Sequence, residues 1–146
     1  LNGNEMELQG IELEIEKQLG ERWKAMANLS LLDAEDKTNG QDVENSTTLI
    51  GNIMLEGKVA DNLLAVINYR HVGDRKRGSG ETRDDLDGYD TVDLTANCFN
   101  LGLKGFTLRI GVKNIFDADR KSPTTIYQDD LPRAGRTWWT QVSRVF

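Results

Sequence analysis

The chain has 146 residues, the size of a single domain, of which 38% are hydrophobic and 29% are charged. Its net charge of −6 argues against nucleic acid as a partner, which a predominantly basic surface would attract. No run of about 18 apolar residues is present, so helical membrane spans are excluded, whereas a β-barrel is not, because its lipid-facing residues alternate with polar ones.

The first predicted elements are two strands joined by a tight turn. Apolar and charged residues alternate from Ile11 to Leu19, which is the two-residue period of a strand. After the turn at Gly20–Glu21, a second alternation runs from Trp23 to Leu31. The polar stretch from Asp33 to Thr48 is rich in Asp, Asn, Thr and Gly, and this composition predicts a loop.

The next two strands repeat this arrangement. Apolar residues share one parity from Leu49 to Leu55, in a strand that is predicted to end near Gly57–Lys58. A short connection at Ala60–Asn62 leads into a strand from Leu63 to Arg70. Gly73–Asp87 is predicted to be a second long polar loop.

Three further strands complete the pattern, giving about seven in all. Thr91–Cys98 and Phe106–Lys113 alternate clearly, and a short turn at Asn100–Gly105 joins them. A third long loop, Asp117–Gly135, contains both prolines, and a last strand runs from Arg136 to Phe146. The sequence therefore predicts an all-β fold, an antiparallel up-and-down meander.

The connections alternate regularly between short and long, which is typical of outer-membrane barrels, with short periplasmic turns and long extracellular loops. The last strand also ends flush on an aromatic residue, Phe146, as the closing strand of a membrane barrel commonly does. Because the chain has neither an initiator methionine nor a signal peptide, we expect it to be part of a longer protein.

Four segments together resemble the TonB-dependent outer-membrane receptor family. Gly111–Asp117 is similar to the family's G-V-x-N-L-F-D motif, and Tyr127–Trp139 resembles its last loop, where P-x-x-G-R leads into the closing strand. Gln9–Ile15 is similar to an upstream G-v-E-l-e strand. Tyr69–Gly73 followed by Tyr89–Leu94 resembles the intervening strand pair. The four segments occur in the family's order and cover nearly the whole chain.

The resemblance implies a transport protein and not an enzyme, located in the outer membrane of a Gram-negative bacterium. Residues 1–146 would form the C-terminal portion of a barrel of about 22 strands, without its plug and N-terminal strands. The intact receptor would take up a scarce ligand in an energised step, usually a ferric siderophore. Its partners would be outer-membrane lipid, TonB through the missing N-terminal region, and the barrel assembly machinery, which reads the terminal Phe146. No cofactor is expected.

The second long loop carries the candidate contact residues. Its basic run contains Arg75 and Arg77, and an acidic cluster follows with Asp84, Asp85 and Asp87. The carboxylates are hard ligands that suit calcium, although their spacing does not fit an EF-hand loop. The basic residues suit an anionic ligand or lipopolysaccharide phosphates. Alternatively, the basic and acidic residues neutralise one another within the loop.

Two further interpretations remain open from the sequence. A soluble β-barrel or sandwich that binds an apolar ligand would place the apolar parity inward and the charged parity outward. A non-transporting outer-membrane barrel, such as an adhesin anchor, would lack the plug. In the membrane-barrel interpretation, Glu12, Glu14 and Glu16 face the lumen, and the adjacent Trp138 and Trp139 face opposite ways.

Overall fold

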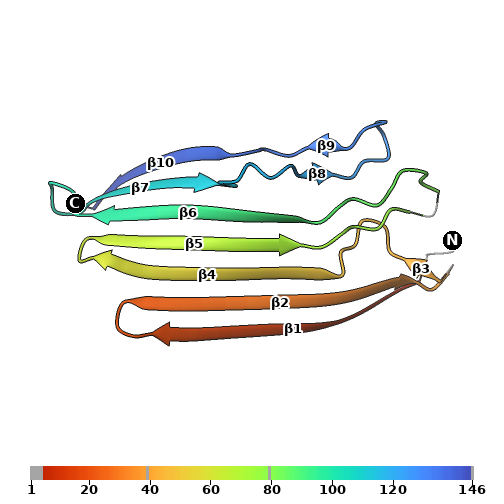
Figure 1. The fold of residues 1–146 in the computed structure, drawn as a ribbon, viewed down its shortest axis with the longest axis horizontal. Helices are drawn as coiled ribbons and strands as arrows, with labels where there is room; N and C mark the ends of the chain where they lie inside the picture. Colours follow the sequence, from red (N-terminus) through yellow and green to blue (C-terminus); the bar gives the residue numbers. More distant parts are fainter. Residues whose placement is uncertain (1–4, 39, 79, 146) are drawn as a thin grey trace.

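The computed structural model describes residues 5–38, 40–78 and 80–145, and their long strands form one extended antiparallel sheet (Figure 1). The long strands lie in the order β1-β2-β4-β5-β6-β7-β10, so each pairs with its neighbour along the chain. The predicted up-and-down meander of about seven strands is confirmed. These strands are β1 (Met6–Leu19), β2 (Trp23–Asp36), β4 (Leu49–Ala60), β5 (Leu63–Val72), β6 (Tyr89–Phe99), β7 (Phe106–Lys113) and β10 (Thr137–Arg144).

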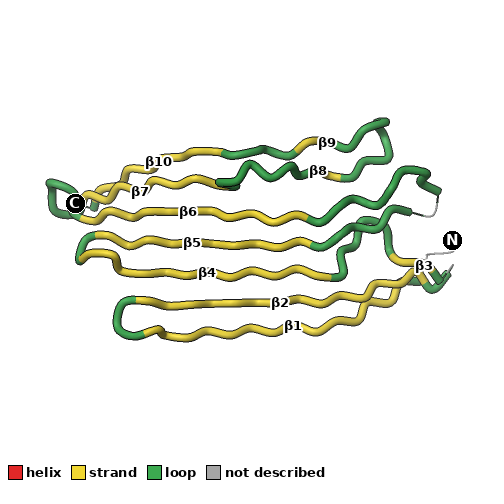
Figure 2. The backbone as a smooth tube through the Cα atoms, viewed as in Figure 1, coloured by secondary structure: helices red, strands yellow, loops and turns green. Residues whose placement is uncertain are grey.

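Three short strands occur in the long loops. β3 (Gln41–Asp42) pairs with the end of β2, and β8 (Lys121–Ser122) pairs with β9 (Leu131–Pro132) in a separate ladder. All three lie at the end of the sheet where the long loops gather, and the short turns lie at the opposite end (Figure 2). Over the described part of the chain, no helix is present that is long and apolar enough to span a membrane.

Several predicted boundaries differ from the structure; β1, for example, begins at Met6 and not at Ile11, and two other differences have a clear physical reason. The stretch from Asp33 to Thr48 is not wholly a loop, because β2 continues to Asp36, where it pairs with Met6 at the start of β1. Main-chain hydrogen bonds of a ladder need no particular side chain, so a polar sequence can extend the strand. Lys37 adds ion pairs at 2.9 Å to Glu7 and 2.7 Å to Glu35.

The second difference concerns β4, which continues past the expected end at Gly57–Lys58 to Ala60. Its pairing with β5 shifts register between Lys58 and Ala60, and this irregularity accommodates one extra residue before the turn. The strand therefore bends at its last residues instead of ending there.

The register separates the side chains into an apolar face and a polar face. One row of cross-strand neighbours on the apolar face runs through Leu55, Ile67, Leu94, Val112 and Trp138, from β4 to β10. Because strand residues alternate between faces, all residues of that parity share the face. No second layer formed by the described residues covers the face, and the exposed fractions of Ile11, Ile53 and Trp138 are 70%, 52% and 70%.

The opposite row is polar. Glu14, Asn28, Asn52, Arg70 and Thr91 are successive partners from β1 to β6. The amide of Asn52 donates a hydrogen bond of 2.7 Å to the side-chain oxygen of Asn28. The glutamates of β1 lie on this face, as predicted from their parity. The sheet is thus a single layer with one apolar and one polar surface. The polar surface extends to the end of the sheet that carries the long loops.

Two tryptophans pack over glycines of neighbouring strands. Trp139 is paired with Gly111 on the polar face, and its indole occupies the space that a Cβ at Gly111 would need. Trp23 has the same relation to Gly57 on the apolar face. Trp138, paired with Val112, lies on the face opposite to Trp139, which confirms the predicted opposite orientation.

Candidate functional site

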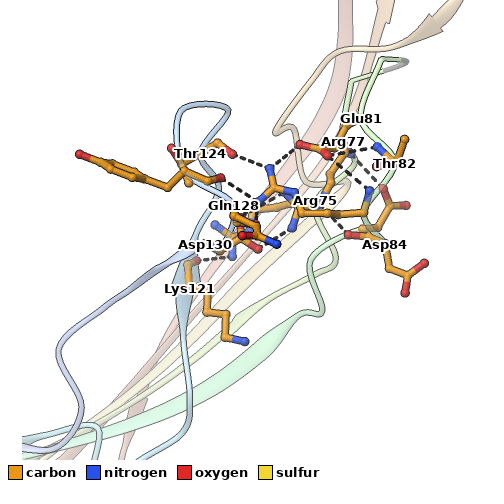
Figure 3. Close-up of polar contacts among 12 residues, drawn as sticks. Arg75, Arg77, Glu81, Thr82, Asp84, Lys121, Thr124, Gln128 and Asp130 are labelled. Carbon is orange, nitrogen blue, oxygen red and sulfur yellow. Dashed lines mark hydrogen bonds and ion pairs between the residues drawn. The ribbon is translucent and has the colours of Figure 1, made fainter.

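The candidate site is formed by the loop between β5 and β6 together with the loop between β7 and β10. These two loops are in contact beyond the end of the sheet, and arginines make most of the connections (Figure 3). The first loop supplies Arg75, Arg77 and Arg83, and the second supplies Asp130 and several main-chain carbonyls. The segments that bracket the two loops are adjacent strands, and this adjacency brings the loops together.

Arg77 makes the most extensive connection. Its two terminal nitrogens donate to the two carboxylate oxygens of Asp130 at 3.1 and 2.5 Å, a bidentate geometry. The exposed fractions of the two side chains are only 8% and 11%. The Nε of Arg77 also donates to the carbonyl of Asp84 at 2.6 Å. Arg77 therefore orders its own loop and attaches it to the next one.

Arg83 makes a second connection a few residues further on. Its guanidinium donates to the carbonyls of Thr124 at 2.6 Å and Gln128 at 3.1 Å, and lies 3.4 Å from a carboxylate oxygen of Asp130. It also pairs with Glu81 in its own loop. Asp130 thus accepts hydrogen bonds from two arginines, and both belong to the other loop.

These contacts change the acidity of the carboxyl groups. The hydrogen bonds from Arg77 lower the pKa of Asp130 below its ordinary value. The hydrogen bond from Arg83 lowers the pKa of Glu81 to about 2. The pKa of Asp85 is lowered first by the main-chain N–H of Arg77, which donates to it at 2.9 Å, and then by Lys76. All three groups are therefore ionised at neutral pH.

The structure brings four of the predicted contact residues to one cavity. Arg75, Arg77, Asp85 and Asp87 line a space of about 320 Å³ between the loops, and Asp84 lies outside its lining. Lys76 and Asp85 form an ion pair at 3.2 Å, as the intraloop interpretation predicts. The guanidinium of Arg77 instead reaches the neighbouring loop. The last predicted residue, Phe146, lies outside the described residues.

A larger cavity of about 560 Å³ lies between all three long loops. Glu44 comes from the first loop, Arg77 and Glu81 from the second, and Thr124 and Thr125 from the third. Its lining combines charged groups with hydroxyls, so it suits a polar ligand better than a lipid. Among the described residues, no group of three His, Cys, Asp or Glu side chains is placed to hold a metal ion, so the geometry gives no support to a calcium site.

Several residues of the site were missed by the sequence analysis. Asp130 lies 53 positions from Arg77, and no local pattern relates the two. Arg120 and Arg133 lie near Tyr89, at the base of the loops, although they come from distant segments. The adjacency of the two loops follows from the strand order, but the choice of partners does not.

Comparison with known proteins identifies related barrels. The family model described as "TonB dependent receptor-like, beta-barrel" matches residues 1–115. The fold is similar to that of the copper transporter OprC, with a TM-score of 0.79 and 21% identity, covering 98% of this chain and 24% of that one. No curated protein sequence matches the chain.

Two receptors have a similar fold. One is a mutant of the ferric enterobactin receptor PfeA from Pseudomonas aeruginosa, with a TM-score of 0.79 and 22% identity over 95% of this chain and 22% of that one. The other is the siderophore receptor PiuA from Acinetobacter baumannii, with a TM-score of 0.75 and 17% identity over 95% of this chain and 21% of that one. The chain thus spans under a quarter of the length of the solved structures named here.

Proposed function

The chain belongs to the family of TonB-dependent receptor-like β-barrels, and from this premise we propose that it forms part of an outer-membrane receptor for energised ligand uptake. Residues 1–146 would be the C-terminal portion of the barrel, which in the whole receptor has about 22 strands around a plug. The long loops would be extracellular and the short turns periplasmic.

The observation that carries this proposal is the uncovered apolar face of the sheet. Exposed apolar side chains of this kind occur from β1 to β10, for example Leu13 at 53% and Val142 at 58%. An apolar face of this extent is not stable in water without a cover, and lipid supplies one. In the soluble-barrel alternative, this face would point into the protein interior and other parts of the chain would cover it. No second layer of the described chain lies over it.

The proposed ligand is a ferric siderophore. Support comes from two proteins of similar fold, one named as a ferric enterobactin receptor and one as a siderophore receptor, while a third is named as a copper transporter. The polar cavities between the loops offer contacts for a hydrophilic ligand. Arg75, Arg77, Asp84, Asp85 and Asp87 remain the proposed contact residues in this region.

The proposed partners follow from the same premise. Outer-membrane lipid would cover the apolar face, and TonB would engage a segment of the receptor outside this chain. The barrel assembly machinery would recognise Phe146. Deleting Phe146 should therefore lower the amount of receptor in the membrane more than it lowers the stability of receptor that is already assembled.

The direct test is uptake by cells that carry the whole receptor. Accumulation of a radiolabelled ferric siderophore should require both the receptor and an energised inner membrane. Cells without the receptor and cells without TonB are the two controls. Equal accumulation in all three strains would contradict the proposal, and so would a receptor that remains soluble and monodisperse without detergent.

A further inference from the structure

A shallow groove of about 280 Å³ crosses the apolar face of the sheet from β1 to β5. It is open above Gly51 in β4, which has no side chain to fill it. A Cβ placed at Gly51 would meet Leu29 at 3.6 Å, an ordinary contact, and otherwise only the carbonyl oxygen of Asn28 at 4.0 Å. Leu13, Leu29 and Ile53 line the groove with apolar side chains that remain exposed.

A polar cluster lies at the β5–β6 end of this groove. Tyr69 and His71 line the groove, and Asp90 is the ladder partner of His71 on the same face. The hydroxyl of Tyr69 donates to a carboxylate oxygen of Asp90 at 2.6 Å, and Nδ1 of His71 lies 2.9 Å from the same oxygen. The next residue of β6 on this face is Val92, so a carboxylate here interrupts an apolar surface.

The groove runs obliquely between the two ends of the sheet. Asp90 lies nine residues before the end of β6 at Phe99, whereas Leu13 lies six residues before the end of β1 at Leu19, and both strands end at short turns. The polar end of the groove is therefore nearer the long loops than the apolar end. In the proposed orientation, the polar end lies at the outer surface of the membrane, where a charge on the lipid face is tolerated.

The polar cluster offers hydrogen-bond acceptors. A carboxylate only accepts, so Tyr69 and Nδ1 of His71 both donate to Asp90. In the neutral imidazole, Nε2 of His71 is then an acceptor. Among the described residues, the second carboxylate oxygen of Asp90 has no hydrogen-bond partner, and no Lys or Arg pairs with it. A matching headgroup therefore donates hydrogen bonds and carries a positive charge, as an ammonium group does.

We propose that the groove binds one membrane lipid with an ethanolamine headgroup, namely phosphatidylethanolamine. Its ammonium group donates to Asp90 through charge-assisted hydrogen bonds, and one acyl chain lies over Gly51. The proposal rests on the proposed function in one respect, because it takes the apolar face as the membrane-facing surface. It goes beyond that function by assigning a headgroup and a position to one lipid of the layer that surrounds the barrel.

The test is lipid retention by the whole receptor, measured by native mass spectrometry after release from detergent. The probes are phosphatidylethanolamine, phosphatidylcholine and phosphatidylglycerol with identical acyl chains, mixed in equal amounts. Phosphatidylethanolamine should be retained about tenfold or more over the other two. Choline has no N–H to donate, and the anionic glycerol lipid has no cation for Asp90.

Two variants locate the site. D90N removes the charge but keeps an acceptor for Tyr69, so it is the safer variant for folding, and it should abolish the preference. G51L fills the groove and should reduce retention of phosphatidylethanolamine about tenfold. The matched controls are D61N, in the short turn between β4 and β5, and A96L, on the same face of β6 but outside the groove. Both should retain the lipids as the parent receptor does.

The outcomes separate this inference from the proposed function. Equal retention of the three lipids by the parent receptor, or an unchanged preference in D90N, overturns the lipid site even where the receptor takes up its ligand. Retention that G51L does not reduce also overturns it, because the lipid would then lie on another surface. A preference that depends on Asp90 in a receptor without energised uptake supports the lipid site and contradicts the transport function.

Discussion

Arg77 and Asp130 lie 53 positions apart and yet form the bidentate ion pair that joins two long loops, with both side chains almost excluded from solvent. Arg83 reaches the same carboxylate from the same loop. Asp130 is therefore the carboxylate that the two arginines share, and Arg83 also donates to the carbonyls of Thr124 and Gln128 in the same loop as Asp130. We expect the two loops to move together as one unit while this carboxylate is ionised.

Replacing Asp130 with Asn should loosen the contact between the two loops. The neutral amide cannot accept from both arginines with the same strength, and two charge-assisted hydrogen bonds are lost. Protease cleavage within residues 78–83 and 124–128 of the folded receptor should become about tenfold faster. Asp129 is the matched control, because it is an exposed neighbouring carboxylate, and D129N should leave the cleavage rate unchanged. Equal rates in D130N and the parent would show that other contacts hold the loops.

Acid should have the same effect as D130N. The pKa values of Asp130 and Glu81 are lowered in the folded protein. Their ion pairs therefore stabilise the loops fully at pH values above the ordinary carboxyl pKa of about 4. This contribution is lost as the pH falls through the lowered values, which for Glu81 means toward about 2. Spin labels at G80C and T125C should give a narrow distance distribution at pH 7 and a broad one near pH 2 to 3. A distribution that stays narrow at low pH would contradict this assignment.

Sidedness can be measured with single cysteines in a C98S background. T125C and G80C lie in long loops and should react with an impermeant maleimide on whole cells. D61C and L101C lie in the short turns and should react only after the outer membrane is permeabilised. The reverse labelling pattern would invert the proposed topology.

The two faces of β7 should differ in their tolerance of charge. Arginine in place of Ile110, on the apolar face, should destabilise the folded receptor in lipid by about 2–4 kcal/mol near the bilayer midplane. T107R places the same charge on the polar face, which already carries Arg109, and should be nearly neutral. Urea titration in lipid vesicles measures both. Similar losses on the two faces would indicate a sandwich and not a membrane barrel.

Alanine at Gly111 should be poorly tolerated, because its methyl group would enter the space that the indole of Trp139 occupies. We expect a loss of about 1–3 kcal/mol from overpacking, together with altered tryptophan fluorescence. Gly51 is the control: a Cβ there would lie 3.6 Å from Leu29, an ordinary contact, so G51A should be tolerated. If G111A matched G51A in stability, the indole would be free to move aside.

The strands and their two faces were predictable because they depend on local alternation. From Thr91 to Cys98 in β6 and along β7, for example, residues of the apolar face alternate with residues of the polar face, and a one-residue shift in register would invert the two faces. The extension of β2 to Asp36 was not predictable in this way, since the ladder there is formed by main-chain groups beneath polar side chains.

The candidate site was predictable only in part, for a different physical reason. The basic run with Arg75 and Arg77 and the acidic residues that follow it were visible as charges, but ion pairing depends on distances in space. Lys76 found a partner nine positions away in its own loop, whereas Arg77 found Asp130 in the next one. Exposed loops can satisfy such charges in several ways, so composition alone does not select the partner.

The edge strand β1 carries a constraint on the strand that pairs with it in a complete barrel. Glu12 and Glu14 lie opposite Ser30 and Asn28 on one side, and no cation of the described chain pairs with either glutamate. A strand that adds to the other side of β1 would place its own side chains directly beside these carboxylates. We expect that strand to carry Lys, Arg or amide donors at alternate positions. Glu12 and Glu14 thus constrain the residue types of a strand that lies outside this chain.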